Sequence, residues 1–200
     1  MDLFDSAADE LYELSELPAG ARVRYQPRAL SSTRADALLA HLRDHSDWRN
    51  EQFRHVRARR STAWVAEVGV DYRYSGQLQV GRGWDPLLEE LRAELVERLG
   101  CALNSLLLNR YPDGRAGMGW HADDEPELGS APVVVSISLG ATRDFQLKPK
   151  AGGAIRTLAL EHGGLLVMDA RTQELCLHRL PPRARLSGER INLTFRDMRA

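Results

Sequence analysis

The second half of the chain is a succession of short apolar segments separated by turn residues, and this pattern limits the fold more than any other feature. The segments cover residues 103–111, 133–139, 142–147, 155–160, 165–168, 175–180 and 191–195. Between them stand Pro112–Gly114, Gly140, Gly163–Gly164 and Pro181–Pro182. Short segments with regular punctuation are typical of antiparallel β-strands. The sequence therefore predicts a β-sandwich or a barrel.

Two amphipathic helices are predicted ahead of these strands. In residues 33–45, Leu38 and Leu42 lie on one helical face, and Thr33-x-x-Asp36 has the capping-box pattern. The second helix has Asp85 as N-cap, proline at its first position, and Gly100 as its stop. We therefore expect one α+β domain over residues 1–200, with the helices first and the β-sandwich after.

The overall composition excludes several classes of partner. The chain has 27 basic and 28 acidic residues, so its net charge indicates neither nucleic acid nor membrane. No apolar run approaches the roughly 18 residues that cross a bilayer, and the first residues lack the features of a signal peptide. We expect a cytoplasmic monomer that binds no membrane. Cys101 and Cys176 are too few for a disulfide scaffold, and each is expected to be a buried free thiol.

The charge is nevertheless uneven along the chain. Residues 1–16 hold six acids and no base, residues 49–60 hold five arginines, and residues 179–199 hold six. A solvated, arginine-rich surface explains the basic segments, and so does contact with phosphates. The segments alone leave both interpretations open.

The first chemical motif is His121-Ala122-Asp123. In an extended segment residues i and i+2 share a face, so this imidazole and this carboxylate can hold one cation together. His178, in the apolar segment 175–180, is the best candidate for a third ligand, since the other histidines lie on a helix, in an arginine-rich segment or before a glycine turn. Two histidines and a carboxylate suit non-haem iron(II) and oxygen chemistry, although zinc remains possible.

The last strand has a polar face. In residues 190–196 every even position is polar (Arg190, Asn192, Thr194, Arg196) and every odd position is apolar. An edge strand with a solvated face is one explanation. The other is a row of donors for a small dicarboxylate, because an arginine fork binds a carboxylate at two points. Asn109 and Tyr111 form a similar i, i+2 pair.

Four motifs and one histidine occur together in the second half. They are NRYPDG (109–114), HADDEP (121–126), SISLGATR (136–143), His178 and RINLTFR (190–196). In order and spacing this combination resembles the AlkB family of iron(II)- and 2-oxoglutarate-dependent dioxygenases, especially its nucleic-acid demethylase branch. The likeness is good from about Tyr72 to Arg196 and loose before about Trp64.

The resemblance implies a double-stranded β-helix, or jelly roll, over residues 103–197, with supporting helices on its N-terminal side. The acidic residues at the start predict an acidic extension at 1–20, and the resemblance implies a nucleotide-recognition region at 45–80. It further implies Fe(II) held by His121, Asp123 and His178, with 2-oxoglutarate and O2 as cosubstrates. The distal carboxylate of 2-oxoglutarate would lie near Arg190, Asn109 and Tyr111, and its iron-bound end near Asn192 and Arg196.

The expected substrate is an N-alkylated base in DNA, with RNA as the second option, and the base is restored with release of succinate, CO2 and, from methyl lesions, formaldehyde. A base in a duplex must be extruded into the active site. The matching residues for this base are Tyr72, Tyr74, Asp124 and Glu125, with Tyr74 and the His121 ring on its two faces. Arg59 and Arg60, in a flexible basic loop, would contact phosphates, and Trp64 is a further stacking candidate.

Two alternatives remain at this point. A 2-oxoglutarate oxygenase of the same chemistry would act on a protein or a lipid. A jelly-roll binding module would have no catalysis at all.

Overall fold

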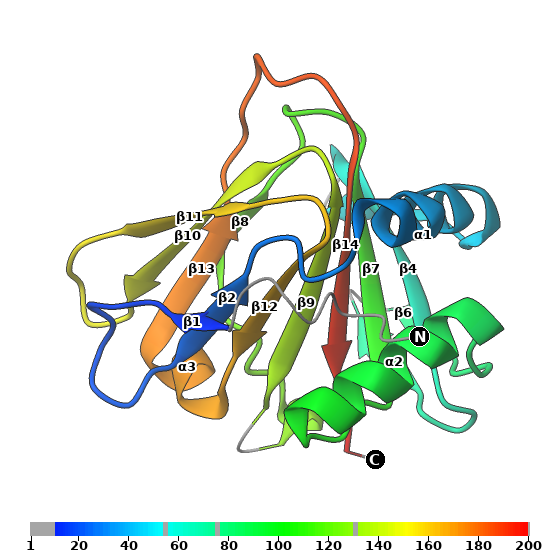
Figure 1. Cartoon of the computed structure of the whole chain (residues 1–200), viewed down its shortest axis with the longest axis horizontal. Coiled ribbons are helices and arrows are strands. Elements are labelled where there is room, and N and C mark those ends of the chain that lie inside the picture. Colours follow the sequence, from blue (N-terminus) through cyan, green and yellow to red (C-terminus); the bar gives the residue numbers. More distant parts are fainter. Residues whose placement is uncertain (1–10, 54–55, 75–76, 130–131, 200) are drawn as a thin grey trace.

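The computed structural model describes residues 11–53, 56–74, 77–129 and 132–199, with all their side chains except those of 51–53, 56–58, 73, 74 and 77. Two sheets face each other as a sandwich, and within the described residues every strand pair is antiparallel (Figure 1). The large sheet has the order β1 (Tyr12–Glu13), β2 (Val23–Gln26), β12 (Gly164–Met168), β9 (Val134–Gly140), β14 (Arg190–Arg196), β7 (Ser105–Tyr111), β4 (Val56–Ala66) and β3 (Arg49–Phe53). The small sheet has the order β11 (Arg156–Leu160), β10 (Arg143–Pro149), β13 (Cys176–Leu180) and β8 (Met118–His121).

Each of the seven apolar segments corresponds to one strand, so the predicted β-sandwich is confirmed. The space between the sheets is filled by apolar side chains from both. Phe145 and Leu147 of the small sheet meet Val134, Leu166 and Met168 of the large one. Beside this apolar packing lies a cavity between the sheets, and polar side chains of both sheets line it.

The central position of β14 decides between the two interpretations of its polar face. Its odd residues, such as Ile191 and Leu193, pack with the helices on the outer side of the large sheet, and its even residues line a cavity between the sheets. Hydrogen-bonded neighbours lie on both sides, β9 and β7. The strand is therefore covered on both faces, and the solvated-edge explanation is wrong.

The helices α1 (Ser32–His45) and α2 (Pro86–Leu99) cover the outer face of the large sheet (Figure 1). Asp85 caps α2 and Gly100, in the left-handed conformation, ends it, as predicted. The start of α1 differs from prediction. Its N-cap is Ser31, whose side chain accepts the N–H of Arg34, so the Thr33 capping box is wrong by two residues.

The expected order of helices first and strands after is also wrong. β2 and β4 come from the first third of the chain and extend the large sheet on its two sides. The arginine-rich segment expected as a flexible loop is the hairpin of β3 and β4, because β4 pairs with β7 over six residues. A second hairpin, β5 (Tyr72–Tyr74) with β6 (Gln77–Gln79), stands apart from both sheets.

The remaining short elements are α3 (Ala170–Leu175), which joins β12 to β13, and a single 3₁₀ turn at Pro126–Leu128. Cys176 is a buried free thiol as expected, whereas Cys101 is only half-buried because it lies just beyond the end of α2. Among the described residues, none of the helices has the length and apolar character of a membrane span.

Candidate active site

Three side chains from two adjacent strands and from the segment after one of them meet in the cavity between the sheets. His121 ends β8 and pairs in register with His178 on β13, and Asp123 follows two residues later. The Asp123 Oδ1 atom lies 3.7 Å from Nε2 of His121 and 3.9 Å from Nε2 of His178. Within the described part of the chain, this is the one group of three or more histidine, cysteine, aspartate or glutamate side chains whose ligand atoms converge, here within 4.8 Å.

The protonation states suit a metal. His121 Nδ1 lies 2.9 Å from the Gly119 carbonyl oxygen, which only accepts, so Nδ1 donates to it and Nε2 is the ring nitrogen left for a metal. Burial lowers the pKa of His178 to about 4. Burial also acts to raise the pKa of Asp123, but Arg196, His178 and His121 together lower it to about 2. Two imidazoles and one carboxylate are a donor set that fits Fe(II).

Two further side chains hold Asp123 in place. Arg196 Nη2 donates to Asp123 Oδ2 at 2.9 Å, and both side chains are almost fully buried. The backbone N–H of Asp123 donates to Oε1 of Gln173 at 3.0 Å. Gln173 lies on α3, is buried, and was not predicted from the sequence, since a glutamine in a short polar helix carries no pattern that marks it.

The even residues of β14 line the cavity beside the triad. Arg190 Nη2 donates to Ser138 Oγ (2.9 Å) and to Asn192 Oδ1, which also accepts from Ser136 Oγ (3.0 Å). The Nε atoms of Arg190 and Arg196 are buried and have no hydrogen-bond partner among the described residues. A buried donor without a partner is destabilising, so these two atoms are suited to the carboxylates of a bound ligand.

Tyr111 connects the cavity with a second buried arginine. Its ring lies 5.5 Å from Arg190 Cζ and 5.8 Å from Arg143 Cζ. Arg143 in turn donates to the carbonyl oxygens of Ala116 (2.8 Å) and Pro181 (2.9 Å). The motif 136–143 contains Arg143, for which no role was predicted. The structure shows that it fixes the turn after β7 and the Tyr111 ring.

Asn109 also lines the cavity, as predicted for a cosubstrate residue. Its Oδ1 accepts from Arg60 Nε at 3.4 Å, and Arg60 is buried on β4. The expected contact of Arg60 with phosphates is therefore wrong, because a guanidinium enclosed beside Asn109 does not reach a strand outside. Arg59, the next residue back along β4, is exposed.

The predicted base-contacting residues separate into two groups. Glu125 lines the cavity, and its Oε1 accepts from the Tyr72 hydroxyl at 3.2 Å. Asp124 instead is exposed and lies 3.0 Å from Lys150 Nζ, so its expected position facing the base is not what the structure shows. The Trp64 ring packs on Tyr72 at 5.3 Å, behind the Glu125 contact. The side chain of Tyr74 lies outside the described residues.

Comparison with known proteins agrees with this site. The profile described as "2OG-Fe(II) oxygenase superfamily" matches residues 22–196, so the likeness extends well before Trp64, further than the motifs indicated. The rat protein "Alpha-ketoglutarate-dependent dioxygenase alkB homolog 3" is 36% identical over 94% of this chain and 68% of its own length. The mouse protein "DNA oxidative demethylase ALKBH2" is 37% identical over 70% of this chain and 62% of its own length. A solved structure described as OsALKBH1 covers 93% of this chain and all of its own with a TM-score of 0.68, and at 15% identity it supports the fold alone.

The chain belongs to the 2OG-Fe(II) oxygenase superfamily, the class that the jelly-roll fold and the His-Asp-His triad define. Within that superfamily it is a member of the AlkB family, as its identity to alkB homolog 3 over almost the whole chain shows. It is an iron(II)- and 2-oxoglutarate-dependent dioxygenase. The triad fits the metal, and the two unpaired guanidinium donors fit a dicarboxylate.

Proposed function

We propose that this dioxygenase repairs DNA by removing alkyl groups from the ring nitrogens of damaged bases. The names of two relatives, an alkB homolog 3 and a DNA oxidative demethylase, support this proposal. When bound, iron, 2-oxoglutarate and dioxygen supply the oxidation of the alkyl carbon, with succinate and CO2 as co-products. The hydroxylated methyl group leaves as formaldehyde, and the unmodified base remains.

The state of Glu125 is the observation that carries the proposal furthest. Its Oε1 is fixed by the Tyr72 hydroxyl, whereas its Oε2 is buried and has no hydrogen-bond partner among the described residues. A buried carboxylate oxygen needs a donor. The exocyclic amines of adenine and cytosine are such donors. Moreover, 1-methyladenine and 3-methylcytosine carry a positive charge at neutral pH, which complements the carboxylate.

The roles of the other residues follow from their positions. His121, Asp123 and His178 hold the iron. Arg190, with Asn109 and Tyr111, binds the distal carboxylate of 2-oxoglutarate, and Asn192 and Arg196 lie toward its other end. Because Arg190 is already oriented by Ser138 and Asn192, little rotamer freedom is lost when the dicarboxylate binds.

A damaged base reaches this cavity only after it turns out of the stack of bases in its nucleic acid. The protein must therefore replace the stacking contacts that the base loses. The His121 ring, which borders the cavity, serves one face of the base, and Tyr74 serves the other. Tyr72 acts indirectly, because it orients Glu125. Arg59 keeps its proposed contact with phosphates, since it is exposed.

The test is a panel of oligonucleotides, single- and double-stranded, that carry 1-methyladenine, 3-methylcytosine, an etheno adduct or 3-methylthymine, with iron(II) and 2-oxoglutarate. We expect repair of the first two lesions and much weaker repair of 3-methylthymine, which offers Glu125 no amine. Tyr72→Phe is the matched variant, since it keeps the ring and removes only the hydroxyl that holds Glu125. No repair of any base, together with oxidation of a methylated peptide, would show a protein oxygenase instead.

A further inference from the structure

The outer face of the small sheet carries two cations that the chemistry of the cavity does not use. Lys148 Nζ on β10 lies 4.5 Å from the centre of the Trp120 ring on β8, and Arg179 Cζ on β13 lies 4.4 Å from it. Their strand neighbours Leu147 and His178 are buried between the sheets, so the alternation of side chains places both cations on the outer face. We call Trp120, Lys148 and Arg179 the cation–tryptophan cluster.

Within the described part of the chain, no acidic side chain neutralises the two cations of the cluster. Among the described residues, neither Lys148 nor Arg179 forms an ion pair, and the Nε of Arg179 donates only to the neutral Gln146 Oε1 at 2.7 Å. The acid on this face of β10, Asp144, is paired with Arg183. Two unneutralised cations held beside one ring repel each other, and the attraction of each to the ring offsets part of this repulsion.

The cluster lies next to the active site along the chain and in the sheet. Trp120 directly precedes His121, and Arg179 directly follows His178. β8 is the edge strand of the small sheet, so the tryptophan stands at the edge of the sandwich beside the metal ligands. All three side chains are partly exposed. A nucleic-acid strand that places one base beside the metal ligands would therefore pass close to this edge of the small sheet.

We propose that the cation–tryptophan cluster binds phosphates of the strand that carries the target base, next to the nucleotide in the cavity. This inference rests on the proposed function. The ring holds two cations at a short separation, so less side-chain entropy is lost when they contact a polyanion. Such contacts fix the position of the strand without reading its sequence.

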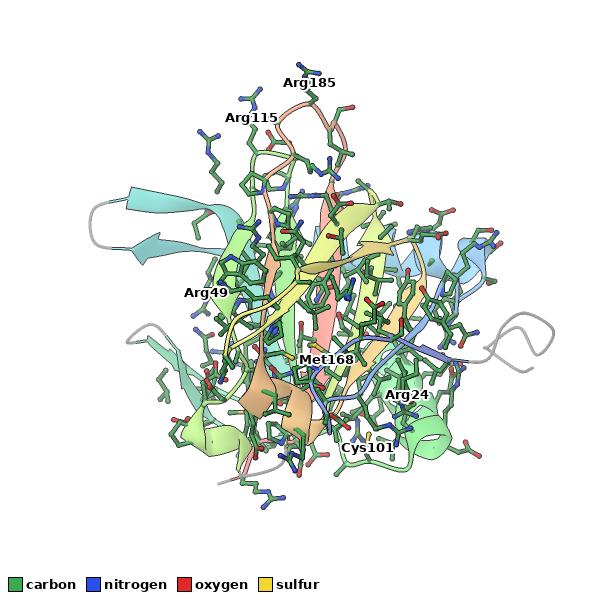
Figure 2. The ribbon with its side chains drawn as sticks, turned by 90° about the vertical axis from the view of Figure 1, so that its left-hand side faces the viewer. Arg24, Arg49, Cys101, Arg115, Met168 and Arg185 are labelled. Carbon is green, nitrogen blue, oxygen red and sulfur yellow. The ribbon has the colours of Figure 1, made fainter. Side chains whose placement is uncertain are left out.

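The test compares the double variant Lys148→Gln/Arg179→Gln with Arg185→Gln. Arg185 is an exposed arginine without an ion pair among the described residues, and it stands at the tip of the molecule, above the small sheet (Figure 2). Binding of an unmodified single-stranded 15-mer is measured by fluorescence anisotropy at several salt concentrations. Repair of 1-methyladenosine, a nucleoside that carries no phosphate, and succinate formation without nucleic acid are measured beside it.

For the double variant we expect roughly tenfold weaker binding of the 15-mer at low salt and a salt slope shallower by about 1.4, since each phosphate contact on a single strand contributes about 0.7. Repair of the nucleoside and succinate formation should stay at the parent's rates, and Arg185→Gln should bind the 15-mer almost as the parent does. Unchanged binding by the double variant, or an equal loss in Arg185→Gln, would overturn the inference. The inference would also fail if a polyglutamate peptide displaced the 15-mer from the parent protein as effectively as a second oligonucleotide does.

The outcome also separates the two proposals. If the parent binds the 15-mer, the double variant loses that binding, and neither removes a methyl group, the cluster is a phosphate site and the proposed repair reaction is wrong. If the parent repairs the lesion and the double variant binds and repairs equally well, only the cluster's role is wrong.

Discussion

Replacing Arg196 with methionine tests how the buried carboxylate of the metal site is stabilised. In the metal-free protein Asp123 and Arg196 form a buried pair, with side-chain exposures of 5% and 7%. Removing one partner of such a pair costs about 3 to 5 kcal/mol, because the other charge stays buried without compensation. The lowered pKa of Asp123 alone corresponds to about 2 kcal/mol at neutral pH, from 3.8 to about 2. We take the lower end of the first range, about 3 kcal/mol, because protonation of Asp123 relieves part of the loss.

The pH dependence has a definite sign. The folded-state pKa of Asp123 is lowered, so its stabilising contribution is present above the unfolded value near 4 and is lost as the pH falls through about 2. Without Arg196 this pKa rises. The difference in the free energy of unfolding between parent and variant should therefore be large at pH 7 and smaller at pH 3.

The assay is urea unfolding of both proteins at the two pH values, in the presence of a chelator. In thermal unfolding, the same loss of about 3 kcal/mol would lower the midpoint temperature by roughly 6 to 12 °C for a chain of this size. Arg196→Lys, which keeps a cation, is the control and should lose less. A loss below about 1 kcal/mol at pH 7, or an equal loss at both pH values, would refute the argument.

Four further predictions concern the site. Asp123→Ala should abolish Co(II) binding, followed by absorbance, and leave the circular dichroism of the sheets intact, whereas His162→Gln, in a turn outside the triad, should bind Co(II) as the parent does. Arg190→Lys keeps the charge but loses the planar fork, so calorimetry should show roughly tenfold weaker binding of 2-oxoglutarate with Co(II) affinity unchanged. Gln173→Leu leaves the Asp123 N–H without an acceptor and should weaken Co(II) binding by roughly 10- to 100-fold; equal affinity would show that the loop needs no such anchor. Tyr74→Ala should lower repair roughly tenfold or more while succinate formation without nucleic acid persists, and a parallel loss of both would assign Tyr74 to packing.

The strands of the second half could be predicted because their signals are local. A strand of five to seven residues shows its apolar face by alternation, as β14 does, and several of the other strands also show an end by glycine or proline. The same alternation placed Arg190, Asn192 and Arg196 on one face. Likewise the i, i+2 spacing joined His121 to Asp123 without any knowledge of the fold.

The contributions of the first half could not be predicted in this way. Whether β2 and β4 join the large sheet depends on hydrogen bonds to β12 and β7, which lie far along the chain. Nothing in the residues 49–60 distinguishes an arginine-rich loop from an arginine-rich hairpin. The burial of Arg60 follows from the pairing of β4 with β7.

The sequence by itself determined which residues are able to hold a metal and a dicarboxylate, since this depends on side-chain chemistry and on spacing within a strand. Only the tertiary structure decided what surrounds them. Gln173 meets Asp123 across 50 residues, Arg196 meets it across 73, and Glu125 is held by Tyr72 across 53. Contacts over such separations arise when sheets pack, and packing depends on the shape of the whole interior rather than on any local pattern.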